Sequence, residues 1–328
     1  MSHQTLLALQ PAHDRPIRSW GRARRFVTAS VVTALAAGSL SVAMLAAGSP
    51  AQAATSCADL NPFMTAWVNS YMSSIGNPNL AAAVFDTSTG CSSRMGATDG
   101  FATASTVKAE IMGALFLSWQ DQGLTSMQPD TEALVTAMIE ESDNAATQAL
   151  YDDLGGGYVL QDYGRRLGMQ TTDNISYGWG GDVTTPDDQL RLLRTLLLGG
   201  GALNANWVAQ ARHFMGSVVP SEDWGVNTGV PTGSTVWLKN GWYFNDGSDW
   251  GPAPAWRVNS IGAVELPNGR SYLIAVYGNE WDTMEEGQSD IGTISDRVAS
   301  VLSAPRTSPA VVYHSLNPSV IAALSTAR

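Results

Sequence analysis

The hydrophobic period of this chain changes from helical to strand-like near Thr235, and few folds accommodate that change. Between residues 103 and 214 apolar side chains recur at helical spacing, in segments that end at glycine runs. After Thr235 the pattern becomes that of strands, and Pro267-Asn268-Gly269 forms a hairpin turn signal between the last two. The predicted helices are 59–74, 103–119, 131–141, 145–154, 158–167, 186–198, 204–214 and 290–302, and the predicted strands are 80–86, 236–244, 255–266 and 271–277.

One early strand, a long helical middle, several late strands and a closing helix predict an α+β fold. The early and late strands are expected to join in one antiparallel sheet flanked by the terminal helices. The helical middle then forms a second, all-helical lobe. A cleft between two such lobes is a natural site for catalysis, so we expect the active site there.

The N-terminus has the pattern of an export signal. A basic region with five arginines precedes an apolar run at 31–47, and residues 51–53 offer an A-x-A cleavage site. We therefore expect residues 1–53 to be a signal peptide, 54–303 the functional domain and 304–328 a weakly packed tail. The mature protein is expected outside the cell or associated with the cell wall, without an integral membrane span.

The remaining composition narrows the possible partners. The expected mature part has a net charge of about −15, which disfavours nucleic acid and anionic membranes as partners. Cys57 and Cys91 are expected to pair in an exported protein, although a reactive thiol is the alternative. The mature histidines, His213 and His314, are far apart in the sequence, so neither a metal site nor another cofactor is expected. A monomer is the default expectation.

The chain contains two lysines, Lys108 and Lys239, beside sixteen arginines. Arginine keeps its proton at any workable pH, whereas a lysine that is buried or near another cation can lose it and act as a base. Ser105 precedes Lys108 by three residues at a helix start, so the two side chains share one face. A serine nucleophile requires such a neighbouring base, and a helix N-terminus stabilises the developing oxyanion.

Three short motifs occur in order: Ser105-Thr106-Val107-Lys108, Ser142-Asp143-Asn144 and Lys239-Asn240-Gly241. Together they resemble the motif set of class A β-lactamases and penicillin-binding proteins. The stretch 178–186 is similar to the end of that family's omega loop, and 257–277 to its last core strands. The resemblance covers roughly residues 57–303 and implies a β-lactamase-like fold.

The resemblance implies a role for each matching residue. Ser105 would attack the substrate carbonyl and become acylated, and Lys108 would take or relay its proton. Ser142 would pass the proton to the leaving nitrogen, while Asn144 would hold the substrate's amide side chain. Lys239 would attract the substrate carboxylate and help to keep Lys108 neutral. Helix capping is the alternative role for both serines.

Four further positions follow from the same resemblance. The backbone amide of Trp242 would complete an oxyanion hole with that of Ser105. Asn240 and Gly241 would line the substrate site, and Asp143 would have a structural role, bonding to backbone near its own loop. On a strand, Asn240 and Trp242 are expected on the face opposite Lys239.

The sequence departs from the family in two places. Asn240 stands where the family usually has a threonine or serine that helps to bind the substrate carboxylate; an asparagine amide can still donate a hydrogen bond there. Residues 169–185 contain no glutamate to orient a deacylating water, and their acids are Asp173 and Asp182. Asp182 matches a structural aspartate of the family, so Asp173 is the candidate base. Without a base, the acyl-enzyme would persist.

These features predict an exported serine hydrolase that forms an acyl-serine with a β-lactam or a related amide. One alternative is a D-alanyl-D-alanine carboxypeptidase or penicillin-binding-like enzyme with slow deacylation on peptidoglycan-type peptides. Another is a non-catalytic protein of the same fold that binds a cell-wall ligand. Retention of both lysines and of Ser142 argues against the last, because a binding protein needs no titratable pair.

Overall fold

A five-stranded antiparallel sheet organises the structure, with its strands in the order β2-β1-β7-β6-β5. The computed structural model describes residues 61–76, 79–98, 100–199 and 201–304, which belong to one compact unit. The early strand joins the late strands in one antiparallel sheet, as predicted, and Ala82 of β1 is opposite Val276 of β7. The strands of the sheet are β1 (Leu80–Asp86), β2 (Cys91–Gly96), β5 (Thr235–Asn245), β6 (Ala255–Glu265) and β7 (Ser271–Trp281).

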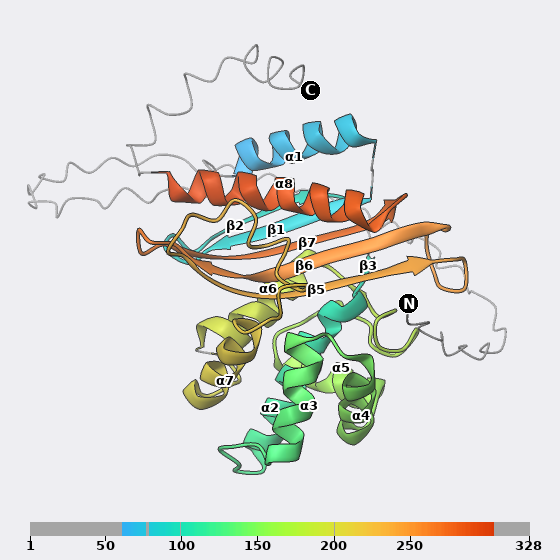
Figure 1. Ribbon diagram of the computed structural model, residues 1–328, viewed down its shortest axis with the longest axis vertical. Coiled ribbons are helices and arrows are strands. Elements are labelled where there is room, and N and C mark those ends of the chain that lie inside the picture. The colour runs from blue at the N-terminus through green and yellow to red at the C-terminus, as the bar shows by residue number, and fades with distance from the viewer. Residues whose placement is uncertain (1–60, 77–78, 99, 200, 305–328) are drawn as a thin grey trace, which may run out of the picture. The chain divides into compact units, whose positions relative to one another are not determined.

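The two terminal helices, α1 (Asn61–Ile75) and α8 (Met284–Ser303), cover one face of the sheet (Figure 1). Strand alternation explains why this face is apolar. Ile274 and Val276 of β7 point into the core beneath the helices, where Ile291 of α8 also packs. Residues of odd number on the same strand enter the core on the other face. The sheet is therefore buried on both sides.

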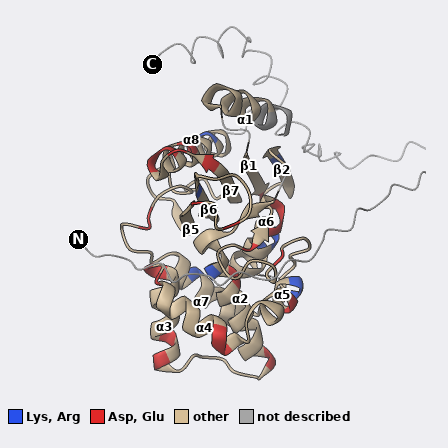
Figure 2. Ribbon diagram, turned by 90° about the vertical axis from the view of Figure 1, so that its right-hand side faces the viewer, with Lys and Arg blue, Asp and Glu red and all other residues tan. Residues whose placement is uncertain are grey.

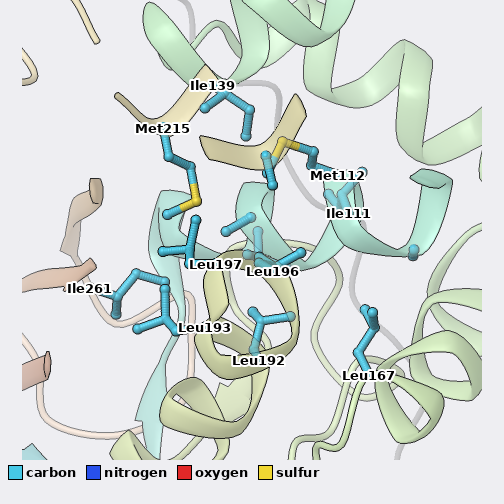
Figure 3. Close-up of a cluster of buried hydrophobic side chains, with 14 of the residues drawn as sticks. Ile111, Met112, Ile139, Leu167, Leu192, Leu193, Leu196, Leu197, Met215 and Ile261 are labelled. Atoms are coloured by element: carbon cyan, nitrogen blue, oxygen red, sulfur yellow. The ribbon is translucent and has the colours of Figure 1, made fainter. Parts of the chain in front are cut away.

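The opposite face of the sheet packs against the helical lobe (Figure 1). Helix α2 runs through the middle of this lobe, and its residues from Val107 to Leu117 are all buried. Figure 3 shows side chains of several helices converging with Ile261 of β6 in this core. The elements are α2 (Val107–Asp121), α3 (Pro129–Glu140), α4 (Asn144–Leu154), α5 (Gly157–Arg166), α6 (Pro186–Leu193), the π-helical turn η3 (Arg194–Leu198) and α7 (Ala205–Met215).

The α+β prediction is confirmed, although several elements differ from those predicted. Strand β2 was not predicted, because its sequence, CSSRMG, is rich in serine and lacks the β-branched residues typical of strands. Helix α8 begins at Met284 rather than at 290. Its first turn is polar, but a capping box between Thr283 and Glu286 marks its start, and that signal was available in the sequence.

A small second sheet ties the segment before Ser105 to the loop expected at 169–185. Strand β3 (Phe101–Ala102) pairs with β4 (Val183–Thr184). Two backbone bonds extend the contact, because Thr103 N donates to Asp182 O at 2.9 Å and Ala104 N donates to Gly180 O at 2.8 Å. The loop is therefore attached directly to the backbone that precedes the serine.

Several predictions concern residues outside the described part of the chain. The described residues do not include the predicted signal peptide at 1–53, Cys57 or the tail beyond 304. Cys91 is disulfide-bonded, as expected for one of the two cysteines. Among the described residues, none of the helices has the length and apolar character needed to cross a bilayer. Figure 2 shows acidic segments on α3 and α4, in keeping with the negative charge of the chain.

Candidate active site

Ser105 lies in a 3-10 turn, η2 (Ala104–Thr106), which leads directly into α2. Asn259 of β6 fixes the entry to this turn, because its amide donates to Ala102 O at 2.8 Å and to Thr103 O at 3.2 Å. Ala104 has a φ of 45°, which is rare for a residue with a side chain. Strain of this kind costs about 1–3 kcal/mol and concentrates at functional sites. The half-buried Ser105 is therefore placed by a backbone held from both sides.

Lys108 is fully buried in the first turn of α2 and has three hydrogen-bond acceptors. Its Nζ donates to Ser142 O at 2.6 Å, to Ser142 Oγ at 3.1 Å and to Asn144 Oδ1 at 2.8 Å. An ammonium has three donors, so this arrangement of three acceptors suits the charged form of Lys108. None of the three bonds goes to Ser105. Lys108 must release one acceptor before it can take a proton from the serine.

Ser142 stands between α3 and α4 with a φ of 58°, the second strained position of the site. Its hydroxyl oxygen accepts from both lysines, at 3.1 Å from Lys108 Nζ and 2.9 Å from Lys239 Nζ. Asp143 caps α4 by accepting from Ala146 N at 2.6 Å, which confirms its predicted structural role. The cap fixes the backbone beside Ser142 and presents its hydroxyl to the two ammonium groups.

Lys239 lies on β5, fully buried, and reaches Ser142 from the sheet side. Its Nζ also donates to Asn240 O at 3.1 Å and lies 3.5 Å from a carboxylate oxygen of Glu222. Glu222 was not among the predicted site residues. It belongs to an irregular segment before β5, and no motif marks it.

The electrostatics of the two lysines differ. Burial, and then the charge of Lys239, lower the pKa of Lys108 to about 7, against the opposite effects of Glu222 and Asp143. Burial also lowers the pKa of Lys239, to about 8, while Glu222 raises it. Burial thus lowers the pKa of both lysines toward neutral pH.

Gly241 allows β5 to approach η2 closely. A Cβ at this position would lie 2.6 Å from Ser105 N and 2.8 Å from Thr106 N. Trp242, the next residue, directs its ring away from η2, since it packs edge-on against Trp224 at 5.7 Å between ring centroids. Only the backbone of Trp242 is therefore available for the expected oxyanion hole.

Asn240 is placed differently from the expectation. Its side chain is buried, and its amide nitrogen donates to Glu222 O at 2.7 Å and to Trp224 O at 3.1 Å. Both donors are thus directed to a neighbouring loop instead of a substrate carboxylate. The sequence could not show this, because the loop partners lie 16–18 positions before Asn240, in irregular chain that precedes β5.

The two acids of the 169–185 loop are bound by groups of that same loop. Asp173 accepts from Ile175 N at 2.9 Å and from Ser176 Oγ at 2.6 Å, so it closes a turn within the loop. Asp182 is buried and accepts from Asn174 Nδ2 at 3.2 Å. The loop instead presents Trp179 to the site, with its ring centroid 5.7 Å from Lys108 Nζ.

Glu110 is a second buried carboxyl that the sequence did not reveal. Asn174 Nδ2 bridges it to Asp182, with 3.2 Å to each carboxyl. Burial, and then the charge of Asp182, raise the pKa of Glu110 well above its ordinary value, and burial raises that of Asp182 to about 8. The loop is thus held by two buried carboxyls whose pKa values are both raised.

The fold and the arrangement of Ser105, Ser142 and two buried lysines define the class of serine β-lactamases and penicillin-binding proteins. Structures of this class match over most of the chain. A mutant of PBP-A in its acyl-enzyme complex with penicillin G superposes with a TM-score of 0.62 at 22% identity, covering 74% of this chain and 96% of that one. A class A β-lactamase variant of the last common ancestor of Gram-negative bacteria gives 0.60 at 24% identity, covering 73% and 98%. At these identities the likeness shows the fold alone.

The chain belongs to the β-lactamase enzyme family, whose sequence model matches residues 120–302. The match includes Ser142 and Lys239 but begins after Ser105. The chain is 29% identical over 177 residues to a protein of Mycobacterium tuberculosis described as a lipoprotein, LppW, covering 52% of this chain and 56% of that protein. It is 25% identical over 255 residues to β-lactamase ROB-1 of Haemophilus influenzae, covering 66% and 77%. The chain thus spans little more than half the length of LppW.

Proposed function

We propose that this protein is an exported serine hydrolase that transfers the acyl group of a β-lactam or related amide to Ser105. The observation that carries the proposal is the position of Ser142 Oγ between the two lysine ammonium groups, at 3.1 and 2.9 Å. A hydroxyl held in this way can pass a proton from one side of the site to the other.

Acylation would begin when Lys108 is neutral. Lys108 Nζ takes the proton of Ser105 Oγ as a new bond forms between that oxygen and the substrate carbonyl carbon. The carbonyl oxygen becomes an oxyanion, held by the backbone amides of Ser105 and Trp242. The carbon–nitrogen bond then breaks, and the leaving nitrogen receives a proton through Ser142. The products are an acyl-serine and, for a β-lactam, an opened ring.

Lys239 and Asn144 would orient the substrate. Lys239 carries the positive charge that a substrate carboxylate requires. Asn144 is exposed and offers its amide nitrogen, since its oxygen already accepts from Lys108. For Asn240, its bonds to the 222–224 loop support a positioning role in place of direct substrate contact.

Deacylation is expected to be slow. The only acids of the 169–185 loop are Asp173 and Asp182, and both are bound within the loop. Trp179 lies where the loop faces Lys108, and an indole cannot act as a base for water. This observation favours the penicillin-binding or D-alanyl-D-alanine carboxypeptidase form of the activity over efficient β-lactam hydrolysis.

The remaining proposals concern location and organisation. We assign residues 1–53 to a signal peptide and 54–303 to the hydrolase domain, with a secreted or cell-wall-associated mature form. A protein described as a lipoprotein among the relatives supports an envelope location. The substrate is a small β-lactam or a peptidoglycan-type peptide, and the working form is a monomer.

Labelling with a fluorescent penicillin tests the activity. The label should appear on the protein and map to the peptide that contains Ser105, and a D-alanyl-D-alanine peptide should lose its terminal alanine slowly. Ser289→Ala, an exposed serine of α8, serves as the matched control and should label like the wild type. If the wild type is not labelled, and Ser105→Ala binds a cell-wall ligand with the same affinity as the wild type, the non-catalytic alternative is supported.

A further inference from the structure

Glu222 is a buried carboxylate next to a catalytic lysine, and no motif of the family accounts for it. It is 5% exposed, and its Oε2 lies 3.5 Å from Lys239 Nζ. That oxygen has no hydrogen-bond partner among the described residues. A buried charge is stabilised mainly by a nearby opposite charge, so the ion pair holds Lys239 and Glu222 as a unit.

The segment that carries Glu222 is fastened at both ends. On the sheet side, Asn240 donates to Glu222 O at 2.7 Å and to Trp224 O at 3.1 Å. On the helical side, Val219 N donates to Glu140 O at 3.0 Å, and Glu222 N donates to Val219 O at 2.8 Å. The carboxylate is therefore placed by β5 and by the end of α3, the two elements that also place Lys239 and Ser142.

Two ammonium groups that share one hydroxyl oxygen repel each other, so charge on one favours loss of a proton from the other. Their surroundings decide which lysine loses it. Glu222 forms an ion pair with Lys239, whereas Lys108 is bonded to neutral oxygens of Ser142 and Asn144. We propose that Glu222 is a positioning residue that keeps the proton on Lys239, so that Lys108 is the lysine that becomes neutral and serves as base. Its catalytic consequence rests on the proposed acyl transfer.

The directions of the pKa shifts agree with this assignment. The pKa of Lys108 is lowered to about 7, first by burial and then by Lys239, and that of Lys239 to about 8 by burial. Glu222 raises both values, and Asp143 also raises that of Lys108. Asp143 is on the N-terminal side of α4 and is separated from Lys239 by Ser142, so Glu222 is the acid that contacts Lys239 directly.

The asparagine of the third motif then has a physical explanation. A hydroxyl residue there has one donor, whereas the Asn240 amide has two and uses both on the carbonyls at 222 and 224. Asn240, which replaces the family's usual threonine or serine, is thus the residue that bonds the 222–224 loop to β5. Asn240 thus positions Glu222, and Glu222 holds the charge of Lys239.

The two lysines of the chain make a direct test possible. Full-length protein labelled with ¹³C at lysine Cε gives two NMR signals, which Lys108→Arg and Lys239→Arg assign. We expect Lys239 to titrate at higher pH than Lys108 in the wild type. In Glu222→Gln, the Lys239 midpoint should fall by about one pH unit or more, a tenfold change in proton affinity, and by more than that of Lys108. Glu222→Asp should restore part of the difference.

Glu140→Gln is the matched control, because it removes a carboxyl near the same segment while the backbone bond of Glu140 O remains. It should leave both midpoints unchanged. An unchanged Lys239 midpoint in Glu222→Gln overturns the assignment. The assignment is also overturned if, in the wild type, Lys108 keeps its proton to higher pH than Lys239. This second test does not depend on whether a variant folds.

The NMR titration needs no substrate, so it separates this inference from the proposed function. If the titration midpoints of Lys108 and Lys239 have the expected order but no penicillin adduct forms, the acyl-transfer proposal fails and the assignment of Glu222 stands. A penicillin adduct at Ser105 with an unchanged Lys239 midpoint in Glu222→Gln would leave the activity and remove the assignment.

Discussion

In the proposed mechanism, the proton of Lys108 decides whether Ser105 can react. Arginine at this position would keep the positive charge but could not lose its proton. We expect Lys108→Arg to lower the acylation rate constant by about 10³-fold, the usual contribution of a general base. Stopped-flow fluorescence with a labelled penicillin measures the rate, and circular dichroism verifies the fold. A rate within a factor of about three of wild type would show that another group takes the proton.

In the proposed mechanism, the pH dependence of acylation follows from the protonation of the two lysines. Lys108 must be neutral, and burial with the charge of Lys239 lowers its pKa to about 7. Lys239 must be charged, and its pKa is about 8. The rate constant should therefore rise about tenfold per pH unit below 7, reach a maximum between 7 and 8 and fall at higher pH. Measurement from pH 5 to 10 tests this, and a flat profile would exclude lysine chemistry.

Strand β5 and turn η2 must approach closely for Ser105 and the strand backbone to act together. Gly241→Ala would place a Cβ 2.6 Å from Ser105 N, against backbone that cannot rotate away. We expect a loss of about 1–3 kcal/mol in the free energy of unfolding and a much larger relative loss of acylation. Urea denaturation and the acylation rate measure the two effects.

Gly262→Ala is the matched control for that change. Its Cβ would meet Trp237 O, a backbone atom of the neighbouring strand, and nothing in η2. It should destabilise the sheet to a similar degree while the folded fraction acylates normally. Equal losses of acylation in both variants would mean that general sheet distortion, rather than the approach to Ser105, accounts for the effect.

The loop at 169–185 contains the buried carboxyl of Asp182, whose protonation should affect the stability of the fold. Burial raises the pKa of Asp182 to about 8, so the folded state retains a proton that the unfolded chain loses near pH 4. The free energy of unfolding should therefore fall as pH rises from about 4 to about 8. Asp182→Asn removes this dependence, and we expect it to be more stable than wild type by about 2–4 kcal/mol at pH 8, with little difference at pH 4.

Urea denaturation at several pH values measures this difference. Asp153→Asn, at an exposed position of α4, is the control and should change the free energy of unfolding little at any pH. An Asp182→Asn variant that is less stable than wild type at pH 8 would show that Asp182 is charged in the folded protein and stabilises the loop as a carboxylate.

Much of the molecule as a whole could be predicted from the sequence. The helix and strand periods gave the α+β fold, because each element buries a regularly spaced face, as β7 does with Ile274 and Val276. Strand β2 was missed because serine fills the positions where strand formers usually stand. The periodicity of apolar residues carries no information about such a polar strand.

In the candidate site, too, some residues could be predicted from the sequence and others could not. Ser105, Lys108, Ser142 and Lys239 belong to motifs, and the structure brings Lys108 and Lys239 to one hydroxyl oxygen. Glu222 could not be predicted, because its partner is fixed by the path of an irregular segment and not by spacing along a helix or strand. Asn240 was expected to contact the substrate, and its hydrogen bonds to the carbonyls of Glu222 and Trp224 were not predicted.

A time course of intact mass after addition of a β-lactam to the mature protein, with Ser105→Ala in parallel, tests whether the chain is an acyl-serine enzyme. We predict that the wild type gains the mass of the β-lactam and keeps it after the free compound is removed, while Ser105→Ala gains nothing. An adduct that appears and clears would show a deacylating base that the loop does not reveal. No adduct on the folded wild type, or an equal adduct on Ser105→Ala, would contradict acyl transfer to Ser105.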